Sequence, residues 1–124
     1  MHMQLIEDSG SGKYKIQAYE QGWIKINETI IHNSVVITPE HLINPWQVTA
    51  IEAVQPHHFL PIFALNPSLV LIGTGKTLVW LAQEHTAAFY QKNIGIEIMD
   101  THSACRTYTL LMAEGRTVAA ALIV

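Results

Sequence analysis

The sequence predicts an α/β protein with an extra β section at its N-terminus. Two observations predict this fold class. The first forty residues fall into short runs of alternating apolar and polar character, as half-buried antiparallel strands do. The second half alternates strand-like and helix-like segments, which is typical of an α/β layer. A length of 124 residues suits one domain, expected to span residues 1–124.

Four short strands are expected before residue 40, separated by turn-forming Gly22, Asn27 and Asn33. They cover residues 14–19, 23–26, 29–31 and 34–37. The middle of the chain is less regular. Residues 44–46 are expected to form a turn, and residues 48–54 either a strand or the approach to a helix. Residues 56–65 are expected to form a short helix with Pro61 in its first turn, where the missing N–H costs little.

The remaining elements alternate. Residues 69–72 are a continuous apolar run, expected for a strand that is covered on both faces. A helix is expected at 83–92, and Asn93 and Gly95 lie where it would end. A strand at 96–99, a helix at 101–113 and a final apolar strand at 117–124 complete the pattern.

The composition indicates a protein that binds other proteins. Hydrophobic residues make up 49% of the chain and charged residues only 14%, whereas soluble domains average about a quarter charged. We therefore expect a protein partner, with a second copy of the chain as one candidate, and exposed apolar side chains such as Trp46, Trp80 and Leu110.

The charge and cysteine content exclude other classes. The net charge is −3 and no Lys/Arg cluster occurs, so we expect no nucleic-acid partner. One cysteine allows no intrachain disulfide, which suits a reducing compartment. We find no apolar run near the roughly 18 residues of a membrane span. A cytoplasmic location without a membrane span is expected.

The segment Gly73-Thr74-Gly75-Lys76-Thr77 resembles a nucleotide loop at first sight. A Walker loop would need glycine at position 70, where the chain has Val70, and the dinucleotide fingerprint fails at Leu78. Both motifs also need a helix directly after the loop, whereas extended chain is expected here. Two interpretations remain: a tight turn that needs glycine backbone freedom, or a turn whose N–H groups hold a carboxylate or phosphate.

The segment from Asp100 to Tyr108 is the second informative stretch. Asp100 or Thr101 can cap the following helix. Six positions share one face of that helix: 101, 104, 105, 108, 111 and 112. Ala104, Tyr108, Leu111 and Met112 are expected to point inward, with Cys105 beside them. Cys105 is then either a buried small hydrophobe, which we prefer, or a nucleophile activated by the helix N-terminus and Arg106. Arg106 is either a solvated charge or an anion anchor near the glycine loop.

These residues define the candidate sites. We assign no catalytic residue; an enzyme would use Cys105, Asp100 and Arg106. The candidate ligand-binding residues are Gly73, Thr74, Gly75, Lys76, Asp100, Thr101 and Arg106. The seven histidines show no metal-ligand spacing, so neither metal nor cofactor is expected.

Several motifs together resemble a known family of small α/β proteins of unknown molecular function, first described structurally from a methanogen. The matching stretches are residues 71–75, 95–101, 104–108, 113–116 and 118–123, with looser matches at 38–39 and 45–46. The family includes a mitochondrial complex I assembly factor and an adipogenesis-associated protein. Its members often have glycine where this chain has His102.

The resemblance implies a three-layer fold with a central mixed sheet of about five strands, flanking helices and extra N-terminal strands. It brings no established activity or cofactor. The leading hypothesis is a non-enzymatic binding or assembly module, assisting respiratory-complex assembly by analogy with the mitochondrial relative. The alternative is a small enzyme or small-anion-binding domain that uses the loop 73–75 and the segment 100–106.

Overall fold

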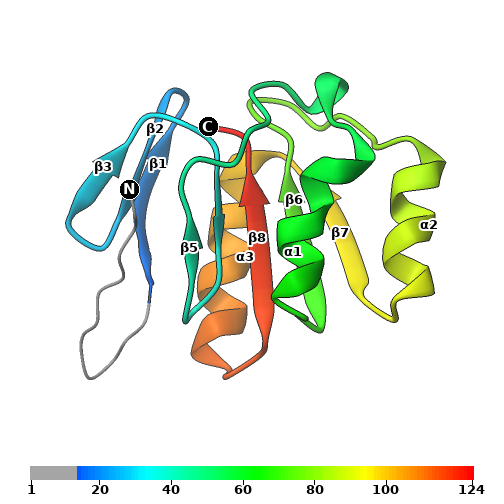
Figure 1. Ribbon diagram of the computed structural model, residues 1–124. Helices are drawn as coiled ribbons and strands as arrows, with labels where there is room; N and C mark the ends of the chain where they lie inside the picture. The colour runs from blue at the N-terminus through cyan, green and yellow to red at the C-terminus, as the bar shows by residue number, and fades with distance from the viewer. Residues whose placement is uncertain (1–13) are drawn as a thin grey trace.

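The computed structural model describes residues 14–124, which form three layers (Figure 1). A five-stranded sheet is the middle layer. One outer layer holds the helices α1 and α2, and the other holds α3 and a separate three-stranded sheet. The strands are β1 Ile16–Glu20, β2 Trp23–Ile26, β3 Thr29–Ile31, β4 Val35–Ile37, β5 Leu42–Ile43, β6 Leu69–Gly73, β7 Gly95–Met99 and β8 Val118–Leu122. The helices are the 3-10 turns η1 Ile51–Ala53 and η2 Pro56–Phe59, and α1 Leu60–Ala64, α2 Gln83–Gln91 and α3 Thr101–Ala113.

The central sheet is mixed and runs in the order β5-β4-β8-β6-β7. β8, β6 and β7 are parallel, whereas β4 is antiparallel to both β5 and β8. β8 lies at the centre and all five of its residues are buried. Its middle residues are three alanines, at positions 119–121, and their small side chains allow the outer layers to approach the sheet closely.

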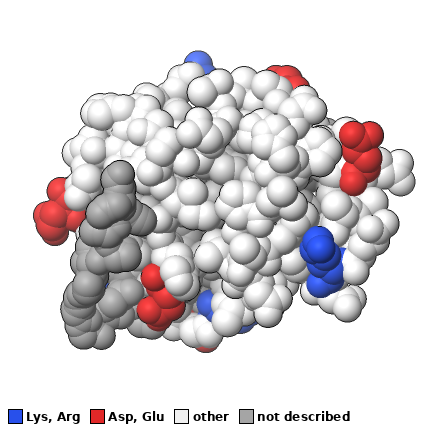
Figure 2. Space-filling view, in the orientation of Figure 1, with Lys and Arg blue, Asp and Glu red and all other residues white. Residues whose placement is uncertain are grey.

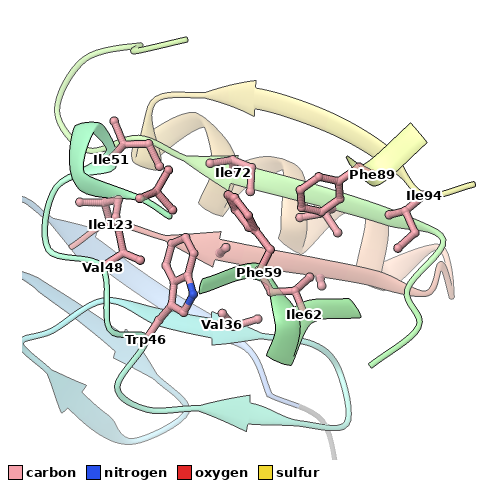
Figure 3. Close-up of a cluster of buried hydrophobic side chains, with 14 residues drawn as sticks. Val36, Trp46, Val48, Ile51, Phe59, Ile62, Ile72, Phe89, Ile94 and Ile123 are labelled. Carbon is pink, nitrogen blue, oxygen red and sulfur yellow. The ribbon is translucent and has the colours of Figure 1, made fainter. Parts of the chain in front are cut away.

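The first core lies between the sheet and the layer of α1 and α2 (Figure 3). Phe59 and Phe89 meet there edge to face, with ring centroids 5.2 Å apart. Trp46 lies in the same core and is only 3% exposed. Our expectation that Trp46 is exposed is therefore wrong. Its indole N–H donates to the carbonyl of His58 at 2.9 Å, so the polar atom is satisfied while the ring is buried.

The second core lies on the opposite face of the sheet. Alternate residues of the central strands, including Leu71 and Ala120, meet α3 and the three-stranded sheet β1-β2-β3 there. The residues of α3 predicted to point inward do so: positions 104, 105 and 108 are buried, and 111 and 112 are partly buried. Thr101, on the same face, is buried as well. Tyr108 extends through this core, and its hydroxyl donates to the backbone carbonyl of Tyr14 at 2.8 Å.

The observed fold confirms the predicted class, with its mixed central sheet, flanking helices and N-terminal β section. Two local details differ from the sequence reading. β5 was not expected, and residues 48–54 contain the turn η1 rather than a strand. The expected helix at 56–65 divides into η2 and α1, with Pro61 in the first turn of α1 as predicted. Across residues 14–124, no helix combines the length and the apolar character that crossing a membrane requires.

Tyr108→Phe should lower the free energy of unfolding by about 1–2 kcal/mol, because it leaves the Tyr14 carbonyl without its buried donor. Tyr90→Phe is the matched control, since Tyr90 is 63% exposed and its change should stay within about 0.5 kcal/mol. Urea unfolding of both variants measures the difference. Equal destabilisation by the two changes would contradict the assigned hydrogen bond.

Candidate functional site

The glycine loop and the start of α3 lie side by side at one edge of the central sheet. β6 and β7 are parallel neighbours with Gly73 opposite Met99, so the segments that follow them leave the sheet at the same edge. Two hydrogen bonds join these segments. The Gly75 N–H donates to Thr101 Oγ1 at 2.8 Å, and the Thr101 N–H donates to the Gly75 carbonyl at 2.9 Å. The structure therefore brings Gly75 and Thr101, two of the candidate residues, into direct contact.

Thr101 links three strand ends through one hydroxyl. The side chain is fully buried, and Oγ1 accepts from Gly75 while donating to the Ile123 carbonyl at 2.8 Å. The Ile123 N–H in turn donates to the Gly73 carbonyl at 2.9 Å. The segments after β6, β7 and β8 are thereby fastened together, and the hydroxyl that we named as a candidate ligand group is already engaged.

Thr74 closes the loop on itself. Its N–H donates to the Met99 carbonyl at 2.9 Å, and its Oγ1 donates to the Thr77 carbonyl at 2.6 Å and accepts from the Val79 N–H at 3.1 Å. The N–H groups of Thr74 and Gly75 therefore point at acceptors within the protein. Lys76 is exposed beside them. The arrangement resembles a structural turn more than an open anion nest.

The two glycines are needed for different reasons. Gly75 has a φ of 103°, which side chains with a Cβ rarely adopt. Gly73 lies where a Cβ would meet Thr101 Oγ1 at 2.9 Å, and both Thr101 Cα and Leu122 Cδ2 at 3.0 Å. The first glycine thus permits close packing of α3 on the sheet, and the second permits the turn.

Asp100 caps α3, as the sequence predicts. Its carboxylate accepts from the Ser103 N–H at 2.9 Å and from the Ser103 hydroxyl at 2.8 Å. These two hydrogen bonds, with a smaller contribution from Arg106, hold the pKa of Asp100 below its usual value. A charged, doubly bonded carboxylate at a helix start stabilises the helix.

Arg106 and His102 lie on the exposed side of α3, one turn apart. Arg106 Nη1 contacts His102 Nδ1, and Nη2 reaches the Ser103 hydroxyl at 3.5 Å. Both residues line a groove between α3 and β1, and no residue of the glycine loop lines this groove. Sequence reasoning missed the groove, because it joins segments about 85 residues apart.

Cys105 lies on the inner face of α3 and is 6% exposed. Burial raises the pKa of its thiol to about 12, and the nearby Arg106 offsets only part of this effect. The side chain is therefore a neutral thiol at pH 7, whereas a nucleophilic cysteine acts as the thiolate. Within residues 14–124, no three His, Cys, Asp or Glu side chains are grouped so that they could hold a metal ion.

An exposed apolar surface lies beside the edge strand β7, and we call it the β7 surface. Trp80 is 71% exposed and Tyr90 is 63% exposed. They border a groove of about 350 Å³ that also includes Leu81, Gln83, Thr86, Ile96, Glu97 and Ile98. Figure 2 shows the side of the molecule that carries α1 and α2, on which charged side chains are few and scattered. Trp80 and Leu110 are exposed as expected.

The layers and the fastened strand ends define a small α/β domain built on a mixed sheet with an appended antiparallel sheet. Comparison with known proteins identifies the family to which this domain belongs. The chain belongs to the family described as protein of unknown function DUF498/DUF598, whose profile matches residues 16–123. The family resemblance read from the sequence is thereby confirmed.

Several curated relatives are named as assembly factors. The rat protein NADH dehydrogenase (ubiquinone) 1 alpha subcomplex assembly factor 3 is 30% identical over 123 residues, which cover 98% of this chain and 66% of the relative. This chain therefore spans slightly less than two thirds of the rat protein.

Solved structures share the fold. A Xanthomonas campestris protein determined by NMR is 35% identical with a TM-score of 0.84, covering 98% of this chain and 92% of that one. A Mth938-like domain from Bordetella pertussis is 26% identical with a TM-score of 0.80, covering 97% and 91%. The three-layer architecture is thus common to these bacterial proteins.

Gly73→Ala should cost about 2–3 kcal/mol of unfolding free energy, because the added methyl group meets the Thr101 backbone. Gly75→Ala should cost about 1 kcal/mol through backbone strain alone. Lys76→Ala is the control and should change stability by less than about 0.5 kcal/mol. Chemical denaturation measures all three, and a Gly73→Ala variant as stable as Lys76→Ala would refute the packing role.

Cys105 should react with a small thiol reagent at least about a hundredfold more slowly in the native protein than in urea, because the thiol is buried and protonated. Thr109→Cys in a Cys105→Ala background supplies the control, since position 109 is exposed on the same helix. That thiol should react quickly in the folded protein. Equally fast native labelling of Cys105 would restore the nucleophile hypothesis.

Proposed function

We propose that this protein is a non-enzymatic binding module that helps to assemble a multiprotein complex, with respiratory NADH dehydrogenase as the first candidate. The assembly-factor name of its curated relatives supports the candidate complex. Because the chain spans 66% of the first of these relatives, the role of the full-length relatives is carried over here as a proposal.

The observation that carries the proposal is the exposure of Trp80 on the β7 surface. In the extended segment after the glycine loop, Val79 and Leu81 pack against the first core, whereas Leu78 and Trp80 face outward. A tryptophan that is mostly exposed beside other apolar side chains is typical of a protein-binding surface. The low charge content of the chain agrees with this assignment.

The backbone of β7 adds a second means of binding. β7 is the last strand of its sheet and pairs with β6 without a break in register. Among the described residues no strand covers its outer edge, so its outward N–H and C=O groups can pair with an extended segment of a partner. Ile96 and Ile98 are half-buried and would contact alternate side chains of that segment.

The charge at the edge favours a different protein over a second copy of the chain. Glu97 is exposed at the middle of β7. An antiparallel pairing of two β7 strands about this position would set the two Glu97 side chains opposite each other, and like charges directly opposite are destabilising. A partner strand with Lys or Arg between apolar residues avoids this repulsion.

An enzymatic role receives no comparable support. Cys105 is a buried neutral thiol, and the N–H groups of Thr74 and Gly75 are engaged within the protein. These groups therefore provide neither an activated nucleophile nor open donors for a developing negative charge.

The test combines Trp80→Ser with Tyr90→Ser in the tagged protein, expressed in cells that lack the native copy. We expect wild type to restore fully assembled NADH dehydrogenase on native gels and to co-purify with its subunits, and the double variant to do neither. Leu60→Ser is the control, because Leu60 is 61% exposed on α1 and does not line the groove beside β7. Thermal unfolding verifies that all variants are folded.

Two outcomes would contradict the proposal. Normal assembly of the complex in cells without the protein would remove respiratory NADH dehydrogenase as the client. Equal co-purification by wild type and the double variant would show that the β7 surface does not bind the partner.

A further inference from the structure

A second groove lies on the opposite side of the molecule, between β1 and α3, with a volume of about 460 Å³. Ligand pockets in proteins typically measure roughly 300–1,000 Å³. This groove shares no residue with the groove beside β7. It is also separate from the glycine loop, so the assembly role proposed above does not depend on it.

The groove carries one positive charge at its rim. Arg106 is held on α3 by His102 and Ser103, which lie four and three residues before it. Neither of these contacts is to a carboxylate. Among residues 14–124 the one ion pair joins Glu114 to Arg116, so no carboxylate of these residues lies within 4.0 Å of the Arg106 guanidinium. Asp100 lies close enough for the charge of Arg106 to contribute to its lowered pKa, but its carboxylate accepts its hydrogen bonds from Ser103.

The walls of the groove are mainly apolar. Ile16 and Ala18 of β1 face Cys105 and Leu110 of α3, and Leu110 is 63% exposed. Tyr19 also lines the groove. Its hydroxyl is buried from solvent, so the ring of Tyr19 rather than the hydroxyl contributes to the lining. An apolar groove with a cation at its rim suits an amphiphilic ligand.

The shape of β1 favours a small molecule over a peptide strand. The pairing of β1 with β2 slips between Ile16 and Ala18, which leaves Gln17 as a bulge. A bulge disrupts the regular spacing of N–H and C=O groups that an added strand requires. The β7 edge has no such irregularity, so the two grooves are suited to different occupants.

We propose that the groove between β1 and α3 binds a small amphiphilic carboxylate. Its carboxylate pairs with the Arg106 guanidinium, which presents planar, directional donors. Its hydrocarbon part lies along Ala18 and Leu110 and covers apolar surface that is otherwise exposed to water.

Octanoate is the probe, titrated into the full chain up to roughly 10 mM and followed by amide NMR shifts, a range that covers millimolar affinity. We expect saturable shifts confined to β1 and α3. Arg106→Gln should weaken binding about tenfold or more. Arg116→Gln is the matched control, because Arg116 does not line the groove, and it should leave the affinity unchanged.

Reversing the head group tests the charge independently of any variant. Octyltrimethylammonium, which has the same chain and the opposite charge, should produce no saturable shifts in this groove. Octanoate shifts that are not saturable, that centre on the β7 surface, or that persist unchanged in a folded Arg106→Gln variant would overturn the proposal. Tighter binding of an apolar pentapeptide with a free C-terminal carboxylate would overturn the assignment to a small molecule.

Discussion

The buried hydroxyl of Thr101 is the constraint on which the sheet edge depends. It joins the segments after β6 and β8 to the first residue of α3, and it does so with one donated and one accepted hydrogen bond. Each such hydrogen bond contributes about 1 kcal/mol net to the stability of the folded state. Breaking one costs more than this, because it leaves a buried donor or acceptor without a partner. Gly73 has no side chain because Thr101 occupies the space. The glycine loop, which resembles a phosphate loop in sequence, is therefore explained by packing.

These hydrogen bonds leave little room for a ligand at the sheet edge that carries the glycine loop. The edge where α/β proteins commonly bind ligands is filled by the protein's own hydrogen bonds. Open grooves lie elsewhere. Two of them are the groove of the β7 surface, where aromatic side chains lie beside an edge strand, and the groove beside β1, where a cation lies beside apolar walls. The binding capacity of the protein is thus proposed to lie on the flanks of the sheet.

The fold could be predicted largely from sequence because its signals are local. The bounds of α3 follow from the Asp100 cap and an apolar face with helical spacing, and β2 and β3 follow from alternation between turn residues. Trp46 and β5 could not be predicted in this way. Trp46 packs against Phe59 and donates a hydrogen bond to His58, which is twelve residues away, so its burial depends on non-local contacts. β5 has only two residues, too few to show the alternation of apolar and polar side chains that marks a strand. The groove between β1 and α3 could not be predicted, because no local pattern in either segment indicates that the two lie side by side.

The central position of β8 has a consequence for how the protein is made. β4 and β6 do not pair with each other; both pair with β8, which follows them in the sequence by 80 and 44 residues or more. Synthesis proceeds from the N-terminus, so the middle of the sheet is absent until residues 118–122 have left the ribosome. Until then the apolar strands on both sides have unpaired edges, which are prone to aggregation. The nascent chain should therefore be most prone to aggregate before β8 emerges, and the central sheet should form only once β8 can join its two sides.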